Sequence, residues 1–327
     1  MKKNIWAFSI VSVLLVISIL LAISVGSVMV PIEEVISAIF HGGGGSGGIV
    51  RDIRIPRVIM AVLVGANLSV AGVLLQGVMR NPLADPGITG ISSGAGVVVM
   101  IVMLYFPGAT KSMALFGFIG GMMACFMIYS LAWKKGISAI RIILAGVAVN
   151  AMLGGLSSMI SILNSESLSG VLTWLNGDLG KKSWAQVRAM SVYTVVGLTF
   201  AFAMSKSCDV LALGDKNAKS LGFNPNRLRI LVSVVAVLLA GISTAYVGII
   251  GFIGLVVPHI SRMLMGSEHR ILMPFTALFG ALTLLVADTL GRTVTAPYEI
   301  PVGIIMTVIG GPFFLYLLRK DDKNYGS

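Results

Sequence analysis

Charged residues are scarce in this chain of 327 residues: Asp, Glu, Lys and Arg together make up 11% of it, whereas 56% is hydrophobic. The mean hydropathy is +0.95. A soluble core of this size would need a solvated surface rich in charge, which this composition does not supply. Several apolar runs of about 20 residues match the thickness of a bilayer instead. The composition therefore predicts a polytopic helical membrane protein.

Cysteine and histidine are scarce as well. Cys125 lies in an apolar run and Cys208 at the end of another, so they predict neither a disulfide framework nor a metal knuckle. The three histidines, His41, His259 and His269, lie in separate segments and predict no metal cluster. The chain has no H-E-x-x-H motif and no nucleophile with an oriented base. We expect no enzyme and no bound metal.

The chain also lacks a phosphate-binding loop. The stretch "HGGGGSGG" at 41–48 is a flexible loop by composition, and no Lys followed by Ser or Thr comes after it. The stretch "GDLGKKS" at 177–183 lacks the Gly that a P-loop carries five residues before Gly180. We therefore expect no nucleotide site on this chain.

Ten apolar segments are long enough to be membrane spans. The first follows a basic start, but its apolar run exceeds the roughly 7 to 15 residues of a cleaved signal peptide, so we interpret it as a retained span. The segments 88–106 and 250–266 are short or rich in Gly and are candidates for partly unwound spans. The predicted spans are 5–28, 58–79, 88–106, 113–133, 139–163, 187–205, 229–249, 250–266, 271–291 and 302–319.

The formal net charge of +11 comes from Lys and Arg in short loops between these spans, which indicates topology signals and not a nucleic-acid surface. With the N-terminus inside, 16 of the 24 basic residues fall on the inner side and 8 on the outer side. This bias predicts that both termini are cytoplasmic. In this topology, spans two to five and seven to ten start in opposite directions, which permits an inverted repeat.

The inner loop 206–229 is longer than a simple turn requires. Its stretch "CDVLALGDKNAKSLGFNPNRLR", 208–229, mixes apolar and polar residues, and Gly214 and Gly222 divide it into two short helical pieces. A compact amphipathic element of this kind lies on the bilayer surface or fills a groove on a partner. The residues of the loop leave both alternatives open.

The stretch "MRNPLADPGITGISSGAG" at 79–96 ends one span and precedes the next. Asn81-Pro82 and Asp85-Pro86 end the helix, because proline disfavours helical geometry before it and has no N–H. The Gly and Ser residues that follow permit irregular backbone, which membranes tolerate where it is buried in protein or lines a wet cavity. The stretch is therefore either irregular backbone of this kind or a well-ordered turn.

Two ionisable residues fall in or near spans. Asp288 lies inside a predicted span, and Arg292 follows four residues later on the same helix face, so we expect the two to pair. His259, in "VVPHISR" at 256–262, lies near the inner end of a short span, where we favour a helix-end or packing role over a proton relay.

Six stretches, taken together and in this order, resemble the iron-siderophore and vitamin B12 permease family of ABC importers. They run from residue 53 to residue 314, so the resemblance covers most of the chain. They are "IRIPR" (53–57), "GANLSVAGVLLQGVMRNPLADPGITGISSGAG" (65–96), "WLNGDL" (174–179), "LALGDKNAKSLGF" (211–223), "GFIGLVVPHISRMLMGSEHR" (251–270) and "ADTLGRTVTAPYEIPVGIIMTVIGGPFF" (287–314).

The resemblance implies an all-α permease of the type II ABC importer kind, with 1–327 forming one transmembrane domain of about ten helices. It implies a second permease subunit, identical or paralogous, two cytoplasmic ATPase subunits and an extracytoplasmic substrate-binding protein. ATP and Mg²⁺ would bind the ATPase, and no cofactor would bind this chain. The loop 206–228 would dock on the ATPase, with small residues letting it seat deeply. Its candidate coupling residues are Leu213, Gly214, Asp215, Ala218, Leu221 and Gly222.

The resemblance also implies roles for residues elsewhere. Arg54, Arg57 and Arg292 match positions that pair with acids of the binding protein; the alternative is that these arginines anchor helices at the membrane interface. The predicted pathway and gate residues are Ser138, Asn150, Ser157, Ser158 and Ser161, with Ala139 standing where the family often has a second small hydroxyl. The structural motif residues are Asn81, Pro82, Asp85, Pro86, Pro258, His259, Asp288, Glu299 and Pro301.

The function predicted from the sequence is that of the permease subunit of an ATP-driven importer that moves ferric siderophores across a bacterial cytoplasmic membrane by alternating access. Haem or a corrinoid such as vitamin B12 is the alternative substrate. An ion-coupled secondary transporter is the alternative class; it would need unpaired intramembrane acids, and only Asp288 falls within a predicted span.

Overall fold

The fold is a bundle of helices, shown by a computed structural model that describes residues 2–26, 30–31, 33–35, 47–87, 89–133, 139–164 and 168–325. Ten helices correspond to the ten predicted spans. Seven of them have the length and apolar composition to cross a membrane, and three apolar helices are shorter. The ten are α1 (Lys2–Ser24), α3 (Ile55–Met79), α4 (Ile91–Tyr105), α5 (Met113–Ala132), α6 (Ala139–Leu163), α8 (Trp184–Ala203), α11 (Pro225–Val247), α12 (Ile253–Met265), α13 (His269–Thr293) and α14 (Val302–Tyr325).

Five shorter elements join them. The π-helix η1 (Ile49–Arg54) runs directly into α3, and the 3₁₀ helix η2 (Pro107–Ser112) precedes α5. The helix α7 (Leu168–Leu175) lies between α6 and α8. The predicted inner loop forms α9 (Ser205–Ala212) and α10 (Asp215–Ser220), which confirms the two short helical pieces.

Capping residues set several helix boundaries. Ser183 and Gln186 form a capping box at the start of α8. Asn224 accepts hydrogen bonds from the backbone N–H groups of Asn226 and Arg227, and Pro225 is the first residue of α11. This cap explains why α11 begins four residues before the predicted span, so that the end of the predicted loop 206–228 is already helical.

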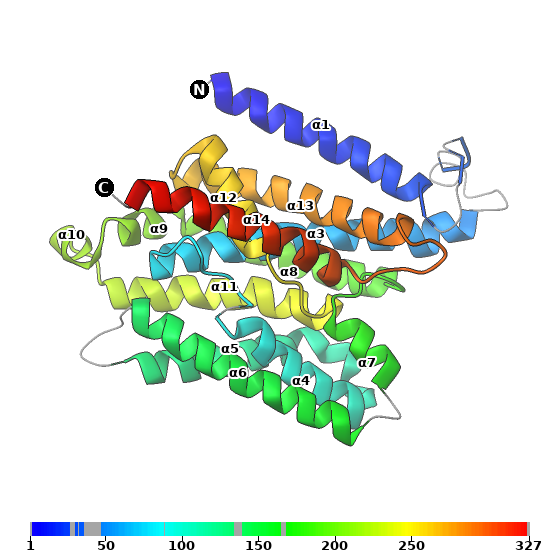
Figure 1. Cartoon of the computed structure of the whole chain (residues 1–327), viewed down its shortest axis with the longest axis horizontal. Coiled ribbons are helices and arrows are strands. Elements are labelled where there is room, and N and C mark those ends of the chain that lie inside the picture. The colour runs from blue at the N-terminus through cyan, green and yellow to red at the C-terminus, as the bar shows by residue number, and fades with distance from the viewer. Residues whose placement is uncertain are drawn as a thin grey trace.

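The bundle has two ends of different character (Figure 1). Both termini and α10 lie at one end, which we call the inner end because the Lys and Arg bias predicts that it faces the cytoplasm. The end of α1 and the start of α3 lie at the opposite, outer end. Within the chain α3, α11 and α13 are mostly buried, whereas α1, α6 and α8 are mostly exposed and are available to lipid or to other subunits.

The two short helices follow breaks in the backbone. The segment between α3 and α4 is irregular, and Ala84, Asp85 and Pro86 within it are buried in protein, as its position between two spans requires. A second irregular segment at 248–252 precedes α12. Both helices start partway along the bundle (Figure 1), which confirms that these two spans are partly unwound.

The two halves of the bundle pack against each other reciprocally. Helix α3 packs against α12 and α13, and α11 packs against α4 and α5. Glycines make both crossings close: a Cβ on Gly65 would lie 2.3 Å from the carbonyl oxygen of Gly280, and one on Gly117 would lie 2.6 Å from that of Gly241. This exchange of contacts is the arrangement expected of an inverted repeat.

Candidate functional site

The element formed by α9 and α10 projects from the inner end of the bundle (Figure 1). Cys208 and Leu211 bury one side of α9, and Gly214 separates the two helices with a positive φ of 89° that glycine adopts without strain. Gly222 follows α10 with a φ of 82°. The glycines are therefore required by the backbone conformation of the element.

Asp215 fixes α10 to the bundle. Its carboxylate accepts hydrogen bonds from two guanidinium nitrogens of Arg229, at 2.6 and 3.1 Å, and Arg80 Nη2 lies 3.8 Å from it. Arg229 also donates to the carbonyl oxygen of Val78, 3.3 Å away. These hydrogen bonds with Arg229 hold the pKa of Asp215 below its ordinary value, with further contributions from Arg229, Arg80 and Lys219 charges. These contacts attach α10 to the end of α3 and to α11.

Apolar side chains of this element face outward. Leu213 is 53% exposed and Leu221 is 58% exposed, and Phe223 is exposed as well. Ala218, in contrast, is fully buried inside the chain. The small size of Ala218 therefore serves packing against the chain itself, and an Arg there would disrupt that packing. A contribution of Ala218 to docking on the ATPase stays a prediction.

A cluster of charges lies at the outer end. Arg57 donates to both carboxylate oxygens of Asp288 at 2.9 to 3.1 Å, and its Nη1 donates to Glu299 at 2.6 Å. Arg292 Nε lies 3.2 Å from Asp288 on the same helix. The predicted pairing of Asp288 with Arg292 is confirmed, and Arg57 is a second partner that the sequence reading did not assign.

Two arginines of the outer end bind the last carbonyl groups of α1. Arg54 donates to the carbonyl oxygens of Ile23 and Ser24 at 2.7 and 2.8 Å, and Arg292 donates to that of Ala22 at 3.1 Å. Cations stabilise the negative end of a helix in this way. The contacts fasten α1 to the start of α3 and the end of α13.

The three predicted docking arginines are therefore inside the protein. Arg54, Arg57 and Arg292 are 5%, 7% and 3% exposed. Contact between their guanidinium groups and the acids of a partner would require them to leave these internal hydrogen bonds. Docking through these side chains stays a prediction, and the geometry of the single chain supports the alternative interpretation that they anchor helices.

The motif residues between α3 and α4 make ordered turns. The Asn81 side chain accepts from the backbone N–H of Leu83 at 2.9 Å, and Asp85 Oδ1 accepts from that of Gly87 at 2.7 Å. The described residues 80–87 thus combine both interpretations from the sequence, because Asn81 and Asp85 order the turns and Ala84, Asp85 and Pro86 are buried. Pro82 is part of a shallow cavity at the inner end.

The motif residues of the second half lie in or beside α12 and α14. Pro258 is buried inside α12. His259 is partly buried in the middle of this helix, which corrects the expectation that it lies near the inner end, and its packing role stays a prediction. Pro301 directly precedes α14.

The turn after α7 was not assigned a role from the sequence. Trp174 and Gly177 pack against the backbone of Gly248, where a Cβ would lie 1.6 Å from the Trp174 carbonyl oxygen, and Asn176 packs against Gly303, where a Cβ would lie 2.3 Å from the Asn176 carbonyl oxygen. Lys182 donates to the carbonyl oxygen of Tyr246, 2.9 Å away, at the end of α11. Burial lowers the pKa of Lys182, while the charge of Asp178 opposes this shift. The turn joins the ends of α7 and α11, where no short sequence motif predicts a contact.

The predicted pathway residues of α6 fall on different faces. The amide oxygen of Asn150 accepts a hydrogen bond from Ser93 of α4, and Ser161 lies against Met100 of α4. Ser158 is exposed and donates to the backbone of its own helix, and Ser157 is partly buried. Ser138 lies outside the described residues. The pathway assignment stays a prediction.

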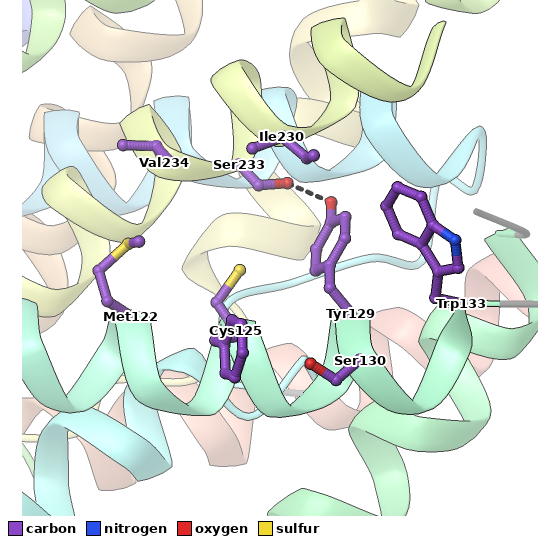
Figure 2. Close-up of a pocket in the computed structure, with 9 residues that line it drawn as sticks. Met122, Cys125, Tyr129, Ser130, Trp133, Ile230, Ser233 and Val234 are labelled. Carbon is purple, nitrogen blue, oxygen red and sulfur yellow. Dashed lines mark hydrogen bonds between the residues drawn. The ribbon is translucent and has the colours of Figure 1, made fainter. Parts of the chain in front are cut away.

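A lateral cavity of about 340 Å³ lies between α5 and α11 (Figure 2). Met122, Cys125 and Trp133 line it, and Tyr129 and Ser233 are joined by a hydrogen bond across it. None of the described residues that line it is charged. The cavity therefore suits an apolar group and offers no charged ligand for a metal chelate. Among the described residues, no group of three or more His, Cys, Asp or Glu side chains could hold a metal ion.

The fold and these two ends define a class: a multi-pass helical membrane transport protein. The chain matches the model of the FecCD transport family over residues 14–320, and it belongs to that family. It is the permease subunit of an ABC importer, and ATP hydrolysis takes place on a separate subunit. Such a permease assembles with further permease and ATPase subunits.

Several curated proteins are similar over nearly the whole chain. The Fe(3+)-citrate import system permease protein YfmD of Bacillus subtilis is 40% identical over 320 residues, covering 98% of this chain and 96% of that protein. The iron(3+)-hydroxamate import system permease protein FhuG of the same organism is 34% identical, covering 98% of both. The hemin transport system permease protein HmuU of Yersinia pestis is 39% identical, covering 84% of both.

Two solved structures share the fold. One is an inward-facing conformation of a transporter assigned to the metal-chelate type of ABC transporter, with a TM-score of 0.82 and 28% identity, covering 97% of this chain and 99% of that one. The other is PsaBC from Streptococcus pneumoniae in complex with Fab, with a TM-score of 0.61 and 17% identity, covering 88% and 95%. The second likeness concerns the fold alone.

Proposed function

We propose that this permease imports a ferric siderophore or a related ferric chelate through a bacterial cytoplasmic membrane. The names of its relatives support a chelate of iron: one is a ferric citrate permease and another a ferric hydroxamate permease, both from Bacillus subtilis. Haem is the second candidate because a similarly close relative is named a hemin permease. A corrinoid is a further alternative from the sequence resemblance.

The whole chain acts in this proposal as one transmembrane domain. It pairs with a second permease, identical or paralogous, and works with two cytoplasmic ATPase subunits that hold ATP and Mg²⁺, while this chain binds no cofactor itself. An extracytoplasmic protein delivers the chelate to the outer end. Arg54, Arg57 and Arg292 hold the helices that form this end, and they are the candidate docking residues should the outer cluster open when the binding protein arrives.

The coupling element carries the proposal. Leu213 and Leu221 are large apolar side chains exposed at the inner end, on an element that Asp215 and Arg229 fix to the buried helix α11. A rigid element with an exposed apolar surface is suited to fill a groove of the ATPase. Movement of the ATPase would then reach α11 through the Asp215–Arg229 pair, and the two halves of the bundle would rock about a central pathway.

The alternative of an ion-coupled transporter has less support from the geometry. Its candidate ion site, Asp288, is buried with Arg57 and Arg292 as partners, so its carboxylate is already neutralised inside the chain. Uptake into intact cells distinguishes the two classes: uptake that stops on ATP depletion and resists ionophores supports the ABC importer, and the reverse result supports ion coupling.

Co-purification tests the coupling element. Wild-type membranes extracted in mild detergent are expected to yield this chain together with an ATPase subunit. Leu221→Arg should abolish this association and leave the yield of the permease unchanged, because Leu221 is exposed. Tyr298→Arg, at a position of the outer end that is 80% exposed, is the control and should retain the ATPase. Retention of the ATPase by Leu221→Arg would refute the docking role of this surface.

Substrate choice is tested by uptake of labelled ferric citrate, a ferric hydroxamate and haemin, each in a strain that lacks its other importers. We expect uptake of one of the two ferric chelates to depend on this chain. Dependence of haemin uptake alone would overturn the ferric chelate proposal in favour of haem.

A further inference from the structure

A polar cavity of about 210 Å³ lies at the inner end, beside the coupling element. It is enclosed by the end of α3, the last residue of α9, the last turn of α12 and the first residue of α13. This volume accommodates a small ion of a few heavy atoms. Its polar lining consists of Gln76, Arg80, Asn81, Arg262, Ser267 and His269.

The cavity is positively charged. Arg80 and Arg262 both line it, and none of the described residues that line it is an acid. The nearby Asp215 accepts from Nη1 and Nη2 of Arg229 and forms an ion pair with Arg80 at 3.8 Å, which takes up none of the N–H groups of Arg80 in a hydrogen bond. Arg262 donates one N–H to the side-chain oxygen of Gln76, at 3.0 Å. Since a guanidinium has five N–H donors, both arginines keep donors for an anion.

His269 supplies a second, independent feature. It is 4% exposed, and its Nε2 is buried without a hydrogen-bond partner, whereas Nδ1 lies 2.6 Å from Asp209. Nε2 points towards α3, because a Cβ on the cavity residue Gly77 would lie 3.7 Å from it. A buried polar atom without a partner is rare in native proteins and calls for a ligand or a water.

The tautomer of His269 determines what the ligand must offer. The Asp209 carboxylate is an acceptor and also accepts the backbone N–H of His269 at 3.2 Å, so Nδ1 carries the proton and Nε2 holds a lone pair. The ligand therefore needs acceptor oxygens for the arginines and an O–H donor for Nε2. Hydrogen phosphate has both at neutral pH, and a phosphate monoester has both in its singly charged form, whereas sulfate has only acceptors.

We propose that this cavity binds a phosphate group, with its oxygens on Arg80 and Arg262 and its P–OH on His269 Nε2. A bound phosphate joins α3, α12 and α13 directly beneath the coupling element. Bidentate contact of guanidinium with phosphate oxygens is the strong form of such recognition. The source is inorganic phosphate from the cytoplasm or the headgroup of an anionic lipid, since both present this chemistry at the inner end.

Calorimetric titration of the purified full chain in detergent with inorganic phosphate tests the site without any transport assay, so its outcome is independent of the function proposed above. We expect saturable binding of phosphate and, at equal ionic strength, at least about tenfold weaker binding of sulfate. Arg80→Gln should weaken phosphate binding by about tenfold or more, the loss of one charge-assisted contact. Arg80 is half-exposed, so this variant is expected to fold.

Two further variants keep the test decisive. His269→Phe should remove the preference for phosphate over sulfate. Arg270→Gln removes a positive charge from the exposed neighbour of His269, outside this cavity, and should leave binding unchanged. The proposal is overturned by equal binding of phosphate and sulfate to wild type, by the absence of saturable binding, or by an equal loss in Arg80→Gln and Arg270→Gln.

Competition identifies the source of the phosphate. Nanodiscs containing phosphatidic acid, a lipid phosphate monoester, are compared with nanodiscs of phosphatidylcholine alone. Loss of inorganic phosphate binding in the first and not in the second assigns the site to a lipid headgroup. Equal binding in both assigns it to free phosphate.

Discussion

The two ends of this permease use buried arginines differently. At the outer end, Arg57 and Arg292 pair with the buried Asp288, and Arg54 binds the last carbonyls of α1, so the network closes within the chain. At the inner end, the side chain of Arg229 is 1% exposed but that of its partner Asp215 is 42% exposed. The outer network joins long helices to one another, whereas the inner network holds a projecting element to the bundle.

The sequence alone does not distinguish an arginine that is buried in the chain from one that binds a partner. Arginines near span ends resemble partner-binding residues, but the structure buries Arg54, Arg57 and Arg292 at the outer end and Arg229 at the inner end. The surface left for a partner at the inner end is apolar, with Leu213 and Leu221 exposed. At the inner end, the surface that can bind a partner therefore consists of exposed apolar side chains. The buried Arg229, through Asp215, attaches the element that carries them to the bundle.

The largest effect is expected for the closed outer network. Asp288→Asn leaves two buried guanidinium groups without their shared carboxylate, and we expect the free energy of unfolding to fall by about 3–5 kcal/mol. Reversible unfolding in mixed micelles measures this loss. If Asp288→Asn were as stable as wild type, Asp288 would not stabilise the outer arginines, and the proposed difference between the two ends would be wrong.

At the inner end, removing the charge of Asp215 should lower the stability of the protein less and the local order of α10 more. Asp215→Asn weakens the hold on α10, while Arg229 keeps its hydrogen bond to Val78. We expect a loss of about 1 kcal/mol in the free energy of unfolding, together with faster proteolysis within residues 205–224. Lys216→Gln, an exposed change on the same helix, is the control and should cleave at the wild-type rate. Unchanged proteolysis in Asp215→Asn would contradict an anchoring role.

A smaller effect is expected at the rim of the outer network. Glu299 accepts one hydrogen bond from Arg57 but its side chain is half-exposed, so water replaces it readily. Glu299→Gln should lower the free energy of unfolding by less than about 1 kcal/mol, measured in the same micelles as Asp288→Asn. A loss equal to that of Asp288→Asn would mean that burial does not determine how much Asp288 and Glu299 each contribute to the free energy of unfolding.

The smallest effect concerns pH. Because Arg229 holds the pKa of Asp215 below its ordinary value, the stabilisation is fully present above that ordinary value and is lost as the pH falls through the lower folded-state value. The proteolysis rate within residues 205–224 attributable to this pair should therefore be constant between about pH 5 and pH 8. A rate that rises on acidification within this range and disappears in Asp215→Asn would contradict the assignment.

Much of the fold could be predicted from the sequence. Hydropathy located ten helices, and the prolines of 79–96 and the glycines near 250 located the two broken spans, because apolar length and backbone restrictions are local properties. Gly214 and Gly222 likewise divided the inner loop into two helices. The Asp288–Arg292 pair followed from spacing on one helix face.

The contacts that the sequence did not predict join residues that are distant in the chain. Arg57 meets an acid 231 residues away, and Lys182 meets a carbonyl 64 residues away. Ala218 was assigned to a partner surface because small residues suit a close approach to either a partner or the chain itself. Spacing cannot distinguish these two cases, because only packing shows which side of α10 faces the bundle.

The sequence by itself determined that the chain lies in lipid, how many apolar segments it has, and where Pro and Gly interrupt them. It also carries the resemblance to the family. Hydropathy and backbone preference act over a few residues, so both can be read without the fold. Only the tertiary structure decided which charges are inside. Arg54, Arg57 and Arg292 bind α1 and Asp288, Leu213 and Leu221 stay exposed, and His269, Arg80 and Arg262 line one cavity. The physical reason is that burial and pairing belong to surfaces that meet only when distant helices pack.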